Sequence, residues 1–69
     1  MKIQINGAVR EVALHESATL DRLLDVLDVP AERGVAVAVN DEVIPRSLWH
    51  EASVHEGDRV EIIRATQGG

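Results

Sequence analysis

The amino-acid sequence predicts an α+β domain in which one main helix packs on one face of a mixed sheet of about four to five strands. Three observations support this class. The chain has 69 residues, the size of one small domain. Alternating polar and apolar residues flank an Asn-Gly dipeptide near the start, as in a β-hairpin. Only the segment from Leu20 to Leu27 carries leucines at helical spacing.

The chain opens with the predicted hairpin. Lys2 to Ile5 alternates polar and apolar side chains, and Asn6-Gly7 favours a type I′ turn, because both central residues of that turn need a positive φ. We expect the return strand from about Val9 to Leu14. His15 to Ala18 is expected to be a polar connection to the next element.

A single amphipathic helix follows. Thr19 is the expected N-cap residue, with its hydroxyl oxygen accepting a hydrogen bond from a free backbone N–H. Apolar side chains then recur at i, i+3, i+4 and i+7 on one helical face: Leu20, Leu23, Leu24 and Leu27. Pro30 cannot continue the helix because it lacks an N–H, so residues 31–34 are expected to form a loop.

Two strands are expected next. Val35 to Val39 is apolar at every position and rich in β-branched residues, which predicts a central strand covered on both faces. Asn40 to Glu42 is a predicted turn. Val43-Ile44 can form only a short strand, because Pro45 has no N–H to donate to a ladder.

The rest of the domain closes the sheet. Ser47 to Trp49 suggests a helical turn in which Trp49 seals a small aliphatic core, and a polar stretch continues to His55. Glu56 to Asp58 is a predicted turn before the last strand, Arg59 to Arg64. Pairing of this strand in parallel with the first completes a ubiquitin-like β-grasp over residues 1–64. Residues 65–69 are expected to form a flexible tail.

Composition narrows the classes of function. Seven Lys and Arg residues against twelve Asp and Glu give a net charge of −5, which disfavours nucleic acid and anionic membranes as partners. The absence of cysteine excludes disulfides, thiolate metal sites and a cysteine nucleophile. No apolar run approaches the roughly 20 residues that span a bilayer, and no signal peptide is evident. We expect a cytoplasmic protein that is monomeric when free.

No side-chain pattern indicates catalysis or a metal site. His50 and His55, with Glu51 and Glu56 beside them, come nearest to a set of metal ligands. A five-residue step places two histidines poorly on a helix, however, and no third ligand is fixed nearby. We therefore expect no bound metal and no stably bound cofactor.

The chain ends in Gly68-Gly69. Without a Cβ, two successive glycines form a backbone thin enough to enter a narrow channel in another protein and to present the Gly69 carboxylate there. A frayed terminus and a remnant of cloning are the two plainer interpretations.

A second pattern accompanies this ending. Residues of the type Asn-x-x-x-Val/Ile-Pro-Arg-x-x-Trp occur in the middle of the chain, at Asn40, Ile44, Pro45, Arg46 and Trp49. In register with the terminal diglycine, this pattern resembles the small sulfur carriers of thiamin biosynthesis, the ThiS family. The resemblance covers essentially the whole chain and implies the same ubiquitin-like β-grasp fold.

The resemblance implies a protein cosubstrate and not an enzyme. In this family an E1-like adenylating enzyme uses ATP and Mg²⁺ to adenylate the terminal glycine, here Gly69. Sulfur from a persulfide donor then replaces AMP to give a thiocarboxylate, which thiazole synthase consumes. Gly68, Gln67 and Thr66 would thread into the partner with Gly69.

Three other functions stay open. A carrier for molybdopterin or cysteine synthesis would share the tail chemistry and differ in its acceptor. A ubiquitin-like modifier would form an isopeptide with a target lysine, and a passive interaction module would use the sheet alone. For the carrier, Ile44, Arg46 and Ile63 are the expected contacts with a partner; Arg46 could equally anchor its own loop through a salt bridge.

Overall fold

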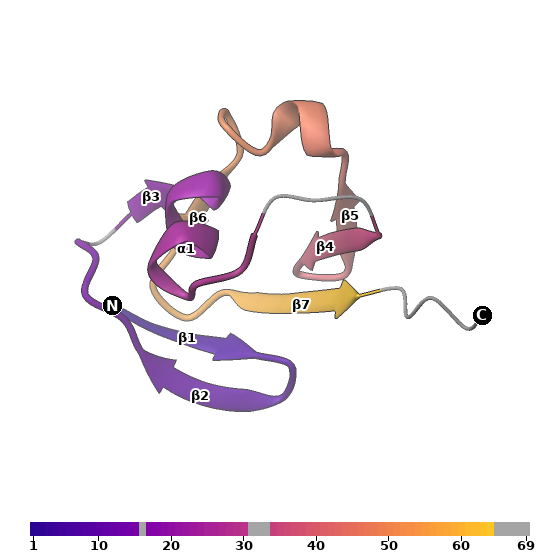
Figure 1. Cartoon of the computed structure of the whole chain (residues 1–69). Helices are drawn as coiled ribbons and strands as arrows, with labels where there is room; N and C mark the ends of the chain where they lie inside the picture. The colour runs from indigo at the N-terminus through magenta and orange to yellow at the C-terminus, as the bar shows by residue number, and fades with distance from the viewer. Residues whose placement is uncertain (16, 31–33, 65–69) are drawn as a thin grey trace.

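Five strands form one mixed sheet in a computed structural model of the chain, which describes residues 1–15, 17–30 and 34–64 (Figure 1). Their order across the sheet is β2-β1-β7-β4-β5. The strands are β1 Lys2–Ile5, β2 Ala8–Glu11, β4 Val35–Val39, β5 Glu42–Ile44 and β7 Arg59–Arg64. β1 runs parallel to β7, and the other three neighbouring pairs are antiparallel. The predicted mixed sheet and the parallel pairing of first and last strands are both confirmed.

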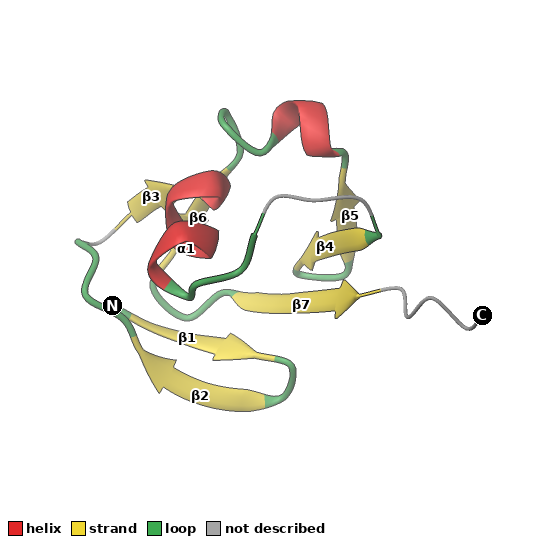
Figure 2. Cartoon of the chain, in the orientation of Figure 1, coloured by secondary structure: helices red, strands yellow, loops and turns green. Residues whose placement is uncertain are grey.

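One α-helix, α1 Leu20–Val26, lies across one face of this sheet beside a second, two-stranded sheet (Figure 2). The second sheet pairs β3 Ser17–Thr19 with β6 Ser53–His55 in antiparallel register. The sequence predicts polar connections at both places, residues 15–18 and the stretch from Trp49 to His55, and that prediction is wrong. A strand of three residues is too short to show a period, and each of these two strands receives its ladder from a partner more than 30 residues away.

The helix begins where the sequence predicts, but the backbone N–H groups at its start donate to acceptors other than the predicted Thr19 hydroxyl. Thr19 is the N-cap residue in extended conformation, yet its side chain makes no capping hydrogen bond. The Leu20 N–H donates instead to the carbonyl oxygen of Ala52 at 2.8 Å, and the Asp21 N–H donates to that of Trp49 at 3.1 Å. The expected role of the Thr19 hydroxyl is therefore wrong, because a distant loop supplies the acceptors.

The end of α1 is a Schellman turn built without glycine. The Val29 N–H donates to the Leu24 carbonyl oxygen at 2.9 Å, and the Asp28 N–H donates to that of Asp25 at 3.1 Å. Asp28 takes the left-handed conformation that this turn requires, with φ 64°. The helix thus stops before Pro30, and its C-terminal turn folds Val29 back toward the sheet.

The core lies between α1 and the sheet face that the helix covers. It consists of Ile3, Ile5, Val12, Leu20, Leu23, Leu24, Val37, Val39, Trp49, Val54 and Val60. Strand β4 contributes alternate residues to it. Val37 is 1% exposed, whereas Ala36 on the opposite face is exposed. The expectation of a central strand is confirmed, since β4 lies between β7 and β5. The expectation that it is covered on both faces is wrong, because among the described residues no second layer covers the outer face.

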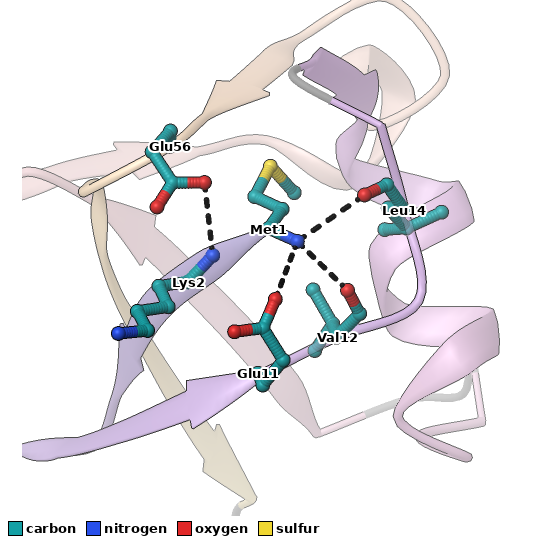
Figure 3. A network of polar contacts seen from close by, with 6 residues as sticks. All are labelled: Met1, Lys2, Glu11, Val12, Leu14 and Glu56. Carbon is teal, nitrogen blue, oxygen red and sulfur yellow. Dashed lines mark hydrogen bonds and ion pairs between the residues drawn. The ribbon is translucent and has the colours of Figure 1, made fainter.

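The hairpin return strand ends earlier than predicted, at Glu11 and not at Leu14. The N-terminal ammonium of Met1 lies at the point where the chain leaves the sheet (Figure 3). This buried group donates to the Glu11 carboxylate at 2.8 Å and to the carbonyl oxygens of Val12 and Leu14 at 3.0 and 3.3 Å. The three acceptors come from one short segment, so that segment wraps around the amino group and leaves the sheet.

The turns and the last strand follow the sequence prediction closely. Asn6-Gly7 and Asn40-Asp41 are two-residue hairpin turns with positive φ at both positions. The helical turn is a short 3₁₀ helix over Arg46–Leu48, and β5 stops before Pro45 as predicted. In the part of the chain that the structure describes, no helix is long and apolar enough to cross a membrane.

Candidate functional site

The strand that leads to the end of the chain is hydrogen-bonded to a neighbouring strand on each side. β7 lies between β1 and β4, and its ladder with β4 runs without a break from Val39↔Val60 to Val35↔Arg64. Arg64 is the last described residue, so the predicted tail residues Thr66, Gln67, Gly68 and Gly69 lie outside the described part of the chain. The sheet therefore fixes the position of Arg64, after which the tail begins.

Two asparagine side chains extend the hydrogen bonding of β7. Asn6 Oδ1 accepts from the Ile62 N–H at 2.8 Å while its Nδ2 donates to the Ile62 carbonyl oxygen at 3.2 Å. In this way a side-chain amide continues the β1–β7 ladder past the last residue of β1. At the other end, Asn40 Oδ1 accepts from the Arg59 N–H at 2.9 Å, and Asn40 Nδ2 donates to Asp58. Asn40 thus joins the β4–β5 turn to the first residue of β7.

The remaining residues of the Asn-to-Trp pattern organise the segment after β5. The Nε1 of Trp49 donates a hydrogen bond of 2.8 Å to the carbonyl oxygen of Ile44, and the tryptophan is 3% exposed. The guanidinium of Arg46 lies 5.9 Å from the centre of the Trp49 ring, within range of a cation–π interaction. The prediction that Trp49 seals the aliphatic core is confirmed.

The structure separates two of the predicted contact residues. Ile44 is paired with Val37, so it lies on the face that α1 covers and packs partly against the core. Ile63 is paired with Ala36 on the opposite face and is 62% exposed. A single flat partner surface can reach Ile63 but not the Ile44 side chain, since the sheet lies between them.

Ile63 belongs to an apolar surface that the sequence analysis did not identify. We call it the outer patch and define it as Ala36, Ala38, Val43 and Ile63. Val43 is 69% exposed and is paired with Ala38, which is only half-buried. The available signal was the alternation in β5: since Pro45 makes Ile44 the last strand residue and Ile44 faces inward, Val43 must face outward.

The described residues contain no group of three His, Cys, Asp or Glu side chains placed to hold a metal ion. His55 Nδ1 lies 3.9 Å from the Asp58 carboxylate, and Asp58 also accepts from the His55 N–H at 2.8 Å. These contacts close the turn before β7. The pair therefore stabilises the turn, and no third metal-ligating side chain of the described residues lies close enough to complete a metal site with it.

Comparison with known proteins gives a consistent result. A model of the ThiS family matches residues 3–69. The sulfur carrier protein ThiS of Escherichia coli (strain K12) is 30% identical over 69 residues, which cover all of both chains. A crystal structure of a thiamine biosynthesis protein (ThiS) from Geobacter metallireducens superposes with a TM-score of 0.85 at 33% identity, again over the whole of both chains.

One relative is much longer. A thiazole synthase of Paramagnetospirillum magneticum is 39% identical over 69 residues, but the chain spans only 20% of that protein's length. In all three comparisons the similarity extends over the whole of this chain.

Proposed function

The chain belongs to the ThiS family, and from that membership we propose that it is the sulfur carrier of thiamin biosynthesis, with Gly69 as the residue that carries the sulfur. One observation carries the proposal. The family match continues through residue 69, so it includes the terminal diglycine as well as the folded domain. The structural match at a TM-score of 0.85 supports the same function for the fold that presents this tail.

The chemistry on Gly69 begins with activation. A carboxylate is a poor electrophile because its charge is delocalised and it has no good leaving group. In the proposed cycle an E1-like enzyme therefore directs the Gly69 carboxylate to attack the α-phosphorus of ATP, with Mg²⁺ bound to the nucleotide, and pyrophosphate leaves. The product is an acyl-adenylate, in which AMP is the leaving group.

Sulfur transfer follows. The terminal sulfur of a persulfide donor attacks the acyl carbon of Gly69 and AMP departs. A thiol then cleaves the sulfur–sulfur bond, which leaves the glycyl thiocarboxylate. Thiazole synthase consumes this nucleophile and returns Gly69 to the carboxylate. The likeness of the chain to one fifth of a thiazole synthase supports this enzyme as the acceptor.

The domain itself takes part in this cycle as a cosubstrate and not as an enzyme. Since the chain has no cysteine, its own terminus is the place where it can hold sulfur as a thiocarboxylate. ATP and Mg²⁺ belong to the activating partner. Gly68, Gln67 and Thr66 thread into that partner, where the lack of a side chain on Gly68 and Gly69 lets the backbone pass a narrow channel. The lack of cysteine also suits a reducing, cytoplasmic environment.

Mass spectrometry of the tail tests the proposal. The chain is incubated with ATP, Mg²⁺, an adenylating enzyme and a persulfide source, and then digested with trypsin, which cuts after Arg64. We expect the peptide from Ala65 to Gly69 to exchange one oxygen for one sulfur, and only when ATP is present. A chain that lacks Gly69 is the matched control and should remain unchanged.

Other results identify other functions. An unmodified tail in the presence of an adenylating enzyme that is active on its own carrier would refute the carrier function. Higher-mass conjugates in cells would identify a ubiquitin-like modifier. A thiocarboxylate that forms but is not consumed by thiazole synthase would point to a different acceptor pathway, such as molybdopterin or cysteine synthesis.

A further inference from the structure

A groove lies on the helix side of the sheet, at the end from which the tail leaves. Its volume is about 410 Å³. Four aliphatic side chains line it: Ile5, Leu27, Val29 and Ile62. The groove exists because α1 has only seven residues and ends in the Schellman turn at Asp28. The helix therefore covers the first part of β7, where Val60 is 1% exposed, and leaves Ile62 only partly covered.

Asn6 and two arginines, Arg10 from β2 and Arg64 from the end of β7, are the other described residues that line this groove. Both arginines are exposed. Within the described residues, neither guanidinium has a carboxylate partner or a hydrogen bond, in contrast to Arg59, which pairs with Asp41 at 2.9 Å. None of the described residues that line the groove is acidic, although the chain as a whole carries a net charge of −5. The groove is thus a local basic site on an acidic protein.

The charge next to the groove differs between its strand side and its helix side. A second hollow shares Val29 with it and is lined by Asp25 and Asp28. Positive charge therefore lies on the strand side of Val29 and negative charge on the helix side. Rigid backbone supports the strand side, since Asn6 holds Ile62 through both of its amide atoms at 2.8 and 3.2 Å.

We propose that this groove is a docking site for an acidic segment of thiazole synthase, with one carboxylate at Arg10, a second at Arg64 and an aliphatic side chain over Ile62 and Val29. The inference rests on the proposed function. Five residues follow Arg64, and an extended chain of that length reaches roughly 17 Å. An enzyme that holds Gly69 in its active site therefore has its surface close to the groove. Each guanidinium offers the fork geometry that recognises a carboxylate, and the aliphatic floor between the strands and the helix suits an apolar side chain of the same segment.

The experiment measures the affinity of purified thiazole synthase for the full 69-residue chain by isothermal titration calorimetry at low and at moderate salt. We compare the wild type with Arg10→Glu and Arg64→Glu. Arg22→Glu is the matched control, because Arg22 is an exposed arginine on α1 that does not line the groove. Each substitution changes the net charge by the same amount. Circular dichroism confirms that all variants fold.

We expect Kd to rise at least tenfold for Arg10→Glu and for Arg64→Glu, and to change less than twofold for Arg22→Glu. Salt should weaken binding of the wild type more than that of Arg10→Glu, because the variant has lost a charge pair. The loss at Arg10 should persist in a chain without Gly68 and Gly69, since the groove acts independently of the tail. Arg10→Glu should still acquire sulfur on Gly69 at the wild-type rate.

Several results would overturn the assignment. Two of them concern thiazole synthase: equal effects of Arg10→Glu and Arg22→Glu on its Kd, or an unchanged Kd in both groove variants. A third is that the groove variants bind the adenylating enzyme less tightly but thiazole synthase as well as the wild type does. A fourth is that the wild type is a dimer that Arg10→Glu dissociates. Failure of the wild type to bind thiazole synthase would also overturn it. If Gly69 of the wild type still gains sulfur in that case, the carrier function stands and only the groove assignment falls. If Gly69 gains none, the proposed function itself has failed.

Discussion

The indole Nε1 of Trp49 donates a hydrogen bond of 2.8 Å to the carbonyl oxygen of Ile44, across the 3₁₀ helix that separates the two residues. Ile44 is the last residue of β5, and Trp49 is part of the core, with 3% of its surface exposed. The bond therefore fixes the end of an edge strand to the interior. Trp49 also offers its own carbonyl oxygen to the Asp21 N–H at 3.1 Å, so one residue connects the sheet edge, the core and the start of α1.

Replacement of Trp49 by Phe should destabilise the domain by about 2–4 kcal/mol. About 1 kcal/mol comes from the lost hydrogen bond and the rest from the volume lost in a packed core. Urea unfolding followed by far-ultraviolet circular dichroism measures this, because the variant has no tryptophan fluorescence. Leu48→Ala is the control, since Leu48 is 45% exposed and its truncation should cost much less. Equal losses in the two variants would contradict this role of Trp49.

Replacement of Asp28 by Gly should stabilise the domain by roughly 0.5–1 kcal/mol. Asp28 holds φ at 64°, a conformation that glycine adopts without a Cβ penalty, and its carboxylate lies at the negative end of the helix dipole. Asp28→Asn separates the two causes, because asparagine removes the charge and keeps a side chain. For a domain of this size the change corresponds to a rise in Tm of a few degrees, which scanning calorimetry detects. A lower Tm for Asp28→Gly would refute the argument.

Stability should depend on pH through Glu11. The pKa of Glu11 is lowered from its usual value of 4.5, first because its carboxylate accepts a hydrogen bond from the N-terminal ammonium and second because that ammonium attracts it. The folded state thus binds this proton less readily than the unfolded state does. The stabilisation is present above pH 4.5 and disappears as the pH falls through the lowered pKa of the folded state.

Urea midpoints measured from pH 7 down to pH 3 test this behaviour of Glu11. Glu11→Gln should be less stable than the wild type at pH 7, and the difference should shrink as the pH falls below 4.5. Glu42→Gln, at an exposed position in β5, is the control and should run parallel to the wild type. A difference between Glu11→Gln and the wild type that stays constant with pH would show that the ammonium contact contributes nothing.

The outer patch should matter for recognition by the activating enzyme. We expect Ile63→Asp to lower kcat/KM for adenylation of the chain by about 10- to 100-fold, the equivalent of one aliphatic side chain that an interface buries. Val9→Asp is the matched control: Val9 is 70% exposed on the same face but lies on β2, at the other edge of the sheet. Pyrophosphate release measures the rate. Full activity of Ile63→Asp, or equal losses in both variants, would exclude the patch as the contact.

The sequence alone determined the elements whose signals are local. Asn6-Gly7 specified its turn because few other dipeptides accept two positive φ values, and the leucine spacing from Leu20 specified one helix. The bounds of β7 were predicted to the residue, Arg59–Arg64, because a turn at Gly57 precedes a run of β-branched residues. The carrier function also came from sequence, through the Asn-to-Trp pattern and the terminal diglycine, and the family comparison supports it.

Tertiary structure alone decided the features that need a distant partner. β3 and β6 are strands only because they pair with each other, and the first turn of α1 finds its acceptors at Trp49 and Ala52. The face that each sheet residue occupies follows from pairing across strands, which is why Ile44 and Ile63 turned out to lie on opposite sides. The groove between Arg10 and Arg64 joins residues 54 positions apart. Periodicity and turn preference act over a few residues, whereas packing and interstrand hydrogen bonds act between segments that meet only after the chain has folded.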